Sequence, residues 1–293
     1  MASLKEIRTR ISSVKTTRQV TSAMKMVSAA KLKKAQNAIL QIRPYADKLH
    51  DILSSLSASL ENSEESVYTR QRSPEKVLIV LISSNRGLCG AFNSSIAKTA
   101  YELASSKYAR QFKSGQLDFF TVGKQGQKYL KSRKISVSDQ ADEILDSLTY
   151  NNCSDLATNL MNDFVSGKYD RIELVYNQFK NAAVQICTKE QFLPVEISEE
   201  DDMSAKNSNF IYEPSKEQIV EELIPKSLKV QIFKALLDSN AAEHGARMTA
   251  MHKATDNATD LIHDLTLTFN KARQAAITNA ILEVTNGAEA LNG

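Results

Sequence analysis

The chain has 293 residues, 42% of them hydrophobic, which is enough for a sizeable core, and no apolar run approaches the ~20 residues of a membrane-spanning helix. Its three cysteines have no metal-ligand spacing and indicate reduced thiols rather than a disulfide framework or a zinc site. The net charge is +3, but the first 50 residues hold 11 Lys and Arg against two Asp and Glu, a local net +9 that predicts a partner for this basic end.

Residues 1–57 are predicted to form one long helix, because the segment from Leu4 to Ser57 contains no glycine and one proline, Pro44. Such a helix spans about 80 Å. Pro44 removes a backbone hydrogen bond, so a kink or break is expected there. Apolar and small residues recur at steps of three and four, with a phase shift between Val14 and Val20 that predicts local overwinding. The predicted stripe is Leu4, Ile7, Ile11, Val14, Thr17, Val20, Met24, Val27, Ala30, Ala35, Ala38 and Ile42.

The basic, serine-rich start also has the composition of a mitochondrial presequence. The same basic pattern continues through Lys34, and no cleavage site divides it. We therefore interpret this segment as part of a mature protein of bacterial type.

The central segment, residues 76–212, has the element order of a Rossmann-like α/β domain. The apolar, β-branched run from Lys76 to Ser84 is typical of a strand buried on both faces of a parallel sheet. Further strands are predicted at 117–122 and 171–179, with 183–197 pairing as a hairpin beside the last of these. Helices are predicted at 92–110, 125–131 and 141–165, and the acidic stretch 198–209 is predicted to be a surface loop. The β-α-β order is the basis of the fold prediction.

The residues that could carry chemistry do not form a recognisable site. The glycine turns 85–91 and 123–126 follow predicted strands, but neither has the complete spacing of a dinucleotide or phosphate loop, so we interpret both as tight turns. Cys89 has no evident base beside it. The four histidines all lie on the long helices, without a metal-ligand set: His50, His244, His252 and His263. We therefore predict no cofactor, no metal and no catalytic residue.

Residues 213–293 are predicted to form a second long helix, with a heptad stripe sustained for more than five repeats. The part from Ser227 to Ala290 would be roughly 95 Å long. The predicted stripe is Leu237, Ala241, His244, Met248, Met251, Thr255, Ala258, Ile262, Leu265, Phe269, Ala272 and Ala276. Small residues in the stripe allow a partner helix to approach closely.

The two long helices join the same central domain at opposite ends of its sequence, so they must be antiparallel if they pair. We predict a two-stranded coiled coil with seam residues Ile7, Ile11, Met248, Met251, Ile262, Leu265 and Phe269. The alternative is that each helix packs on a globular core of its own, which heptads of this length rarely do.

Several local sequences resemble the gamma subunit of F-type ATP synthase. They are Lys5-Glu-Ile-Arg8, Thr21-Ser-Ala-Met-Lys-Met-Val-Ser-Ala-Ala-Lys31, Arg43-Pro-Tyr-Ala46, Ser84-Asn-Arg-Gly-Leu-Cys-Gly-Ala-Phe-Asn93, Glu243-His-Gly-Ala-Arg-Met-Thr-Ala-Met251 and Phe269-Asn-Lys-Ala-Arg-Gln-Ala-Ala-Ile-Thr278. The resemblance covers the whole chain in order.

This resemblance implies a non-catalytic rotor shaft. The coiled coil would enter a ring of three alpha and three beta subunits, which hold the nucleotide chemistry. The central domain would bind the epsilon subunit and the membrane c-ring, at the cytoplasmic face of the bacterial inner membrane. Proton flow through the c-ring would then turn the shaft and drive the beta subunits through their states.

The resemblance also implies contact residues. Arg273 and Gln274 match family positions that engage a catch loop of a beta subunit, and Met24 with Lys25 would face a mobile acidic segment of beta. The family often has an acidic residue where this chain has Lys25. Exposed charges suit a rotor because their contacts are individually modest and can be remade.

Two other function classes remain open from the sequence. A nucleic-acid-binding coiled coil would use the basic first helix, although Tyr45 is the only aromatic residue before Tyr68, which leaves little for base stacking. An NAD-type enzyme would use the central sheet. We prefer the rotor, without nucleic acid as a partner.

Overall fold

The computed structural model describes residues 3–58, 67–195 and 216–292, so the loop predicted at 198–209 lies outside the described residues. The chain divides into two compact units, one of Met1–Ser28 with Met248–Gly293 and the other of Ala29–Arg247. Helices α1 (Leu4–Ala58) and α7 (Lys216–Asn292) each contribute residues to both units. We call the first of these two units the helix-pair unit and the second the α/β unit.

The α/β unit is built on a five-stranded mixed sheet of order β3-β2-β1-β4-β5. The strands are β1 (Val77–Ile82), β2 (Leu117–Val122), β3 (Asp139–Gln140), β4 (Arg171–Phe179) and β5 (Gln185–Leu193). The first four are parallel, and β5 pairs with β4 as the predicted antiparallel hairpin. Strands therefore lie on both sides of β1, with β2 and β3 on one side and β4 and β5 on the other.

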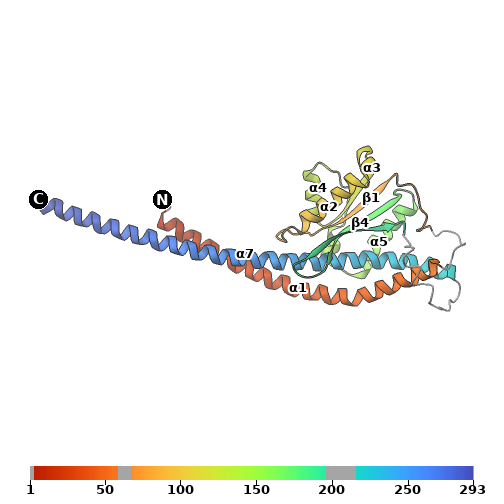
Figure 1. The fold of residues 1–293 in the computed structure, drawn as a ribbon, viewed down its shortest axis with the longest axis horizontal. Helices are drawn as coiled ribbons and strands as arrows, with labels where there is room; N and C mark the ends of the chain where they lie inside the picture. Colours follow the sequence, from red (N-terminus) through yellow and green to blue (C-terminus); the bar gives the residue numbers. More distant parts are fainter. Residues whose placement is uncertain (1–2, 59–66, 196–215, 293) are drawn as a thin grey trace. The chain divides into compact units, whose positions relative to one another are not determined.

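Helices cover both faces of this sheet (Figure 1). One face carries α2 (Phe92–Ser106), α3 (Ala109–Ser114) and α4 (Lys124–Ser132), and the other carries α5 (Tyr150–Val165) and the first part of α7. In β1, Val77, Ile79 and Leu81 pack beneath α2, while Leu78, Val80 and Ile82 pack toward α5 and α7. This double burial explains why β1 is apolar at every position rather than at alternate ones.

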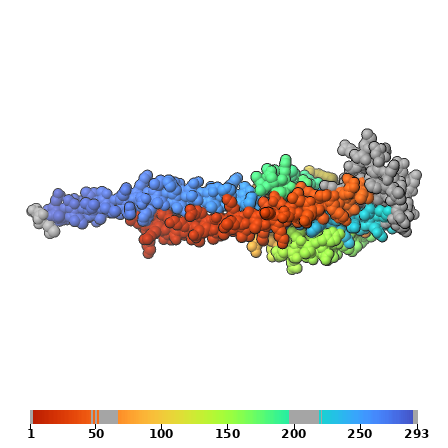
Figure 2. All heavy atoms as spheres, turned by 90° about the horizontal axis from the view of Figure 1, so that it is seen from below, coloured from red at the N-terminus to blue at the C-terminus, as the bar shows by residue number. Residues whose placement is uncertain are grey.

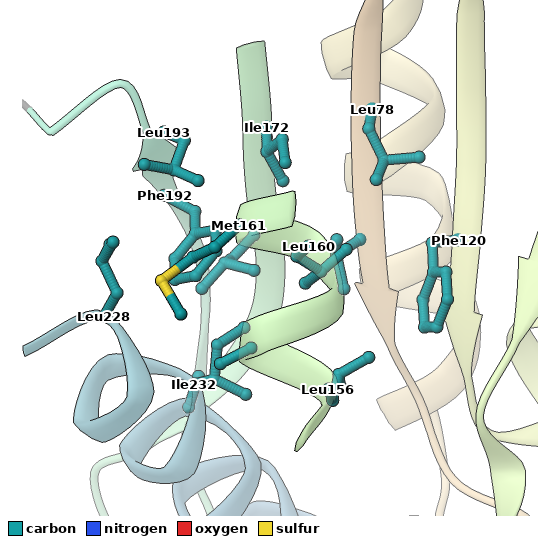
Figure 3. Packing of buried hydrophobic residues seen from close by; sticks show 14 of the residues in the cluster. Leu78, Phe120, Leu156, Leu160, Met161, Ile172, Phe192, Leu193, Leu228 and Ile232 are labelled. Atoms are coloured by element: carbon teal, nitrogen blue, oxygen red, sulfur yellow. The ribbon is translucent and has the colours of Figure 1, made fainter. Parts of the chain in front are cut away.

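The core between the sheet and α7 fixes how that helix lies on the domain (Figure 3). Leu160 and Met161 of α5 fill the space between the strands and α7, and Leu228 and Ile232 of α7 complete the cluster. The first part of α7 therefore belongs to the hydrophobic core of the α/β unit. The same helix therefore belongs to a globular core at one end and to a helix pair at the other.

The predicted helices at 92–110 and 141–165 are each divided in the structure. The first breaks at Tyr108, whose buried hydroxyl donates to the Glu173 carboxylate at 2.5 Å, and α3 starts one residue later. The second consists of a short 3-10 helix, η1 (Asp142–Leu145), and α5, which starts where the Thr149 hydroxyl accepts from the Asn152 N–H. Capping by threonine stops the earlier segment from continuing into α5.

The break expected at Pro44 is wrong, because α1 continues as an α-helix from Leu4 to Ala58 with Pro44 inside it. The side chain of the residue before it, Arg43, bonds to Phe179 and Asp238. Within the described residues, neither long helix nor any shorter one is long and apolar enough to cross a membrane.

Candidate functional site

The helix-pair unit brings together the first part of α1 and the last part of α7 in antiparallel fashion (Figures 1 and 2). A direct bond fixes the register, because the Thr255 hydroxyl donates to the Thr21 hydroxyl at 2.9 Å. Antiparallel pairing in this register places Lys25 opposite Met251 and Leu4 opposite Ala272. The unit is therefore a helix pair up to Ala272 and a single helix beyond it.

The buried stripe of α1 departs from the predicted one after Val14. Val20 and Val27, predicted to lie in the stripe, are 53% and 57% exposed, and Ala30 is also exposed. The buried residues are Thr21 and Ser28 instead, which continue the spacing of Ile7 and Val14 in unbroken steps of seven. The predicted phase shift and overwinding are therefore wrong, because the heptad runs on through polar residues.

Thr21 and Ser28 can be buried because their hydroxyls are already bonded within the helix pair. The Thr21 hydroxyl donates to the Arg18 carbonyl at 3.1 Å, and the Ser28 hydroxyl donates to the Met24 carbonyl at 2.8 Å. A buried hydroxyl with a partner avoids most of the desolvation cost. Ser28 is also smaller than a valine, so α7 can approach α1 more closely there.

The predicted seam residues all lie on the less exposed side of their helices. Ile7 and Met251 are buried, whereas the others are half-buried: Ile11, Met248, Ile262, Leu265 and Phe269. Their individual contacts across the pair stay predictions. Ala276, the last residue of the predicted stripe, is exposed because α1 begins at Leu4 and does not reach it.

Beyond Ala272, every side chain of α7 that the structure describes, from Arg273 to Glu289, is exposed. Four of these are large and apolar: Ile277, Ile281, Leu282 and Val284. An exposed apolar cluster on an unpaired helix end indicates a surface that a partner covers.

The residues predicted to contact a beta subunit fall into two places. Met24 and Lys25 are half-buried within the pair, whereas Arg273 and Gln274 are exposed at the start of the unpaired segment. Arg273 lies roughly 33 Å along the helix from Met251, the residue opposite Lys25. The structure therefore does not bring the two predicted contact sites together.

The α/β unit has the topology in which ligands bind outside the carboxyl ends of β1 and β4, where the strand order reverses. Here that position is occupied by α7. Ala242 and Ala246 of α7 pack with Cys89, Phe92 and Phe179 in one cluster, and the Asn177 amide donates to the Phe92 carbonyl at 3.3 Å. The helix thus fills the place where a nucleotide would bind in an enzyme with this topology.

The two glycine turns are also oriented against phosphate binding. In the turn after β1, the carbonyls of Arg86 and Gly87 accept from the Arg247 guanidinium at 3.0 and 3.3 Å, so the turn presents acceptors rather than N–H donors. In the turn after β2, the N–H of Gly123 donates to Asp142 and that of Gly126 to the Ser83 hydroxyl. A phosphate cradle needs free backbone N–H groups, and these are already bonded.

The thiols and histidines do not form a reactive centre in the described part of the chain. Cys89 is buried, and burial raises the pKa of its thiol above the ordinary value, which disfavours the nucleophilic thiolate. Among the described residues no group of three His, Cys, Asp or Glu side chains could hold a metal ion. His252 and His263 are exposed, each beside an aspartate of its own helix.

His244 lies instead in a buried polar cluster on α7. The Arg247 guanidinium bonds the Glu243 carboxylate at 2.5 Å and approaches Nδ1 of His244 at 3.4 Å. Because arginine can only donate, this ring nitrogen must be the unprotonated acceptor. Burial, reinforced by the charges of Arg247 and Lys31, lowers the pKa of His244 to about 4. The predicted seam histidine is thus a neutral residue between two cations.

We expect His244→Gln to remove part of the acid sensitivity of the fold. A histidine whose folded-state pKa is about 4 and whose unfolded value is about 6.5 stabilises the fold fully above pH 6.5 and loses that contribution as pH falls toward 4. The loss by pH 5 is on the order of 2 kcal/mol. Urea unfolding at pH 8 and pH 5 measures it as a smaller pH difference for His244→Gln than for the unsubstituted chain. The exposed His252→Gln is the control, and an equal effect of the two substitutions would contradict this account.

Comparison with known proteins covers the chain almost from end to end. The profile of the family described as ATP synthase matches residues 3–291. The ATP synthase gamma chain of Flavobacterium johnsoniae is 58% identical over 294 residues, covering 100% of both chains. That of Geobacter metallireducens is 44% identical over 293 residues, again covering 100% of both.

Solved structures show the same fold at lower identity. A chain of the Euglena gracilis mitochondrial ATP synthase rotor aligns with a TM-score of 0.66 at 20% identity, covering 94% of this chain and 98% of that one. A chain of the Tetrahymena thermophila central stalk and c-ring structure aligns with a TM-score of 0.58 at 24% identity, covering 80% and 99%. The family match leaves the nucleic-acid alternative without support, and the chain belongs to the gamma-chain family of ATP synthase.

Proposed function

We propose that the chain is the central rotor shaft of an F-type ATP synthase, a non-catalytic subunit that couples proton flow through a membrane c-ring to ATP synthesis or hydrolysis. The observation that carries this proposal is the similarity over the whole chain to proteins named ATP synthase gamma chain, for example at 58% identity. The structure of the site is consistent with this proposal, because α7 occupies the crevice at the end of the sheet where a nucleotide would otherwise bind. A domain whose crevice is filled in this way suits a non-catalytic subunit.

The partners follow from the family. The alpha and beta subunits would surround the helix pair in a 3:3:1 complex with this chain, with the exposed apolar end of α7 inside the ring. The α/β unit would bind the epsilon subunit and the c-ring. The complex would sit at the cytoplasmic face of the bacterial inner membrane, where this chain is a peripheral component.

We assign the beta-subunit contacts to Arg273, Gln274, Met24 and Lys25. Arg273 and Gln274 are exposed and lie just past the point where α1 begins, so their side chains are free to meet another subunit. Met24 and Lys25 are half-buried and can offer only part of their surface. Arg273 and Gln274 are therefore expected to contribute more to coupling than the other two residues.

The experiment is reconstitution with alpha and beta subunits from a related bacterium, followed by an ATPase assay. Three forms of this chain are compared: unsubstituted, Arg273→Ala with Gln274→Ala, and Lys271→Ala. Lys271 is an exposed cation two residues before Arg273 and about 160° from it around the helix, which makes it a charge-matched control for Arg273. We expect an active 3:3:1 complex with the unsubstituted chain and with Lys271→Ala, and a several-fold lower ATPase rate with the double substitution.

The outcomes separate the proposal from its residue assignment. Failure of the unsubstituted chain to form an active complex would overturn the rotor function. Full activity of the Arg273→Ala, Gln274→Ala form would leave the rotor in place and refute the contact residues. Titration of the isolated chain with NAD and with duplex DNA checks the two rejected function classes, and both should show no saturable binding.

A further inference from the structure

We propose that Arg43 and Asp238 form a joint that locks both long helices to the α/β sheet and so carries torque between the foot of the rotor and its shaft. This inference rests on the proposed rotor function and names residues for a step that the function requires. Arg43 and Asp238 act here as positioning residues, not as contacts to another subunit.

The joint ties together three elements that are distant in sequence. A single guanidinium nitrogen of Arg43, on α1, donates to Asp238 Oδ1 on α7 at 2.8 Å and to the carbonyl of Phe179, the last residue of β4, at 3.1 Å. All three groups belong to the α/β unit. Arg43 is therefore bonded at once to the other long helix and to the sheet.

The carboxylate of this joint is far from solvent. The Asp238 side chain is 0% exposed, against 35% for Arg43, and its second oxygen, Oδ2, is buried without a hydrogen-bond partner among the described residues. Burial raises the pKa of Asp238, while Arg43, the charge of Lys234 and a hydrogen bond from the Phe179 backbone oppose that rise. An apolar residue would pack at such a position at lower cost, so a charged pair here calls for a role other than stability.

A second polar connection lies beside the first. Glu190 of β5 accepts from the Tyr176 hydroxyl of β4 at 2.8 Å and from the Gln231 amide of α7 at 2.6 Å. Gln231 and Asp238 are seven residues apart, so the directional bonds that α7 makes to β5 and to α1 lie about two turns apart along the helix. They add to the apolar core that Leu228, Ile232 and Leu236 of α7 form with the sheet.

Directional bonds matter because the contact between α7 and the sheet is otherwise mainly apolar, apart from the bonds of Arg247 to the turn after β1. Apolar burial is non-directional, so a helix can rotate or slide slightly over such a surface while most of the buried area is kept. A charge-assisted bond in a buried site does not tolerate this, because a small rotation leaves the carboxylate without its partner. The Arg43–Asp238 joint therefore fixes the rotation of α1 and α7 relative to the sheet.

A rotor under load needs this fixation more than a rotor turning freely. Torque applied to the foot reaches the shaft only if the helices do not turn against the domain. We infer that weakening the joint leaves assembly and unloaded ATP hydrolysis in place, and lowers the number of protons pumped per ATP when an opposing proton gradient is present.

The test uses the complete ATP synthase in lipid vesicles, with ATP hydrolysis and ATP-driven proton uptake measured at increasing opposing gradients. The main variant is Arg43→Met with Asp238→Leu, which removes both charges and keeps apolar volume in their place. The control is Lys168→Met, because Lys168 also makes a 2.8 Å ion pair, but with Asp163 of α5 rather than with a long helix. We expect hydrolysis within about two-fold of the unsubstituted complex for both forms. We expect a several-fold loss of loaded pumping for the first form only.

Pumping against a gradient separates the joint from a purely structural ion pair. If the pair serves stability alone, the double variant pumps like the unsubstituted complex at every gradient, and the inference is overturned. If the double variant does not assemble, Asp238→Asn carries the test. It keeps the shape and replaces the ion pair by a weaker hydrogen bond from the Arg43 guanidinium to a neutral amide oxygen. A smaller loss of loaded pumping is therefore expected, and an unchanged ratio of protons pumped per ATP refutes the joint. Failure of the unsubstituted chain to assemble would refute the rotor function instead.

Discussion

Replacing Gly123 by alanine is expected to destabilise the α/β unit by about 4 kcal/mol. Gly123 follows β2 with φ +103°, a conformation that residues with a Cβ rarely adopt. A Cβ at this position would also lie 2.5 Å from the Ser83 carbonyl oxygen and 2.7 Å from its carbon. Ser83 cannot withdraw easily, because its N–H donates to the Val122 carbonyl at 2.7 Å at the end of the sheet.

Gly115→Ala is the matched control for this prediction. Gly115 also has a positive φ, +73°, but a Cβ there meets nothing within 4 Å, so only the backbone strain remains. Its expected cost is about 1 kcal/mol. Urea unfolding followed by tyrosine fluorescence, in a chain without tryptophan, measures both variants. Equal losses would show that the close approach of Ser83 does not matter.

The sheet could be predicted from the sequence because its strands have strong local signals. The strands β2 and β4 have the predicted bounds, and β1 lies within the apolar run at 76–84. The hairpin of β4 and β5 is also confirmed. The sequence did not predict β3, because a strand of two residues, Asp139 and Gln140, is too short to show an alternating pattern. These residues are recognised as a strand only by their pairing with β2.

The helix pair shows where hydrophobicity alone misleads. The sequence stripe followed Val20 and Val27, whereas the structure buries Thr21 and Ser28 and exposes both valines. Burial on a helix follows its geometry, and a constant heptad can pass through small polar residues whose hydroxyls bond within the pair. Regular spacing was the better guide here than apolar character.

The buried ion pairs that join the helices to the sheet had no sequence signal. Arg43 and Asp238 are 195 residues apart, and each looks like an ordinary charge on a long helix. Glu243 and Arg247 have the spacing of a common surface pair, but their environment is set by the turn after β1. One sequence contains no information on such distances, so the structure was needed to find them.

Removing Arg247 is expected to lower the free energy of unfolding by about 3–5 kcal/mol, because it leaves Glu243 charged and buried without its partner. The two side chains are only 9% and 12% exposed. Arg247 also donates to the carbonyls of Arg86 and Gly87, so its loss detaches α7 from the turn after β1. Arg247→Met keeps most of the volume and removes the charge, and urea unfolding at pH 8 measures the change.

A second substitution decides whether the uncompensated charge is the cause. Glu243→Gln in the Arg247→Met background should recover more than half of the loss. Burial already raises the pKa of Glu243 despite Arg247, so a carboxyl that has lost this partner takes up a proton more readily in the folded state. The destabilisation should therefore be largest at pH 8 and smaller at pH 5. Lys98→Met is the control, because Lys98 and Glu102 have the same spacing but are 68% and 54% exposed, and its expected cost is below about 0.5 kcal/mol. A loss that does not change with pH, or that Glu243→Gln does not reduce, would mean that lost packing and the lost turn contacts account for it instead.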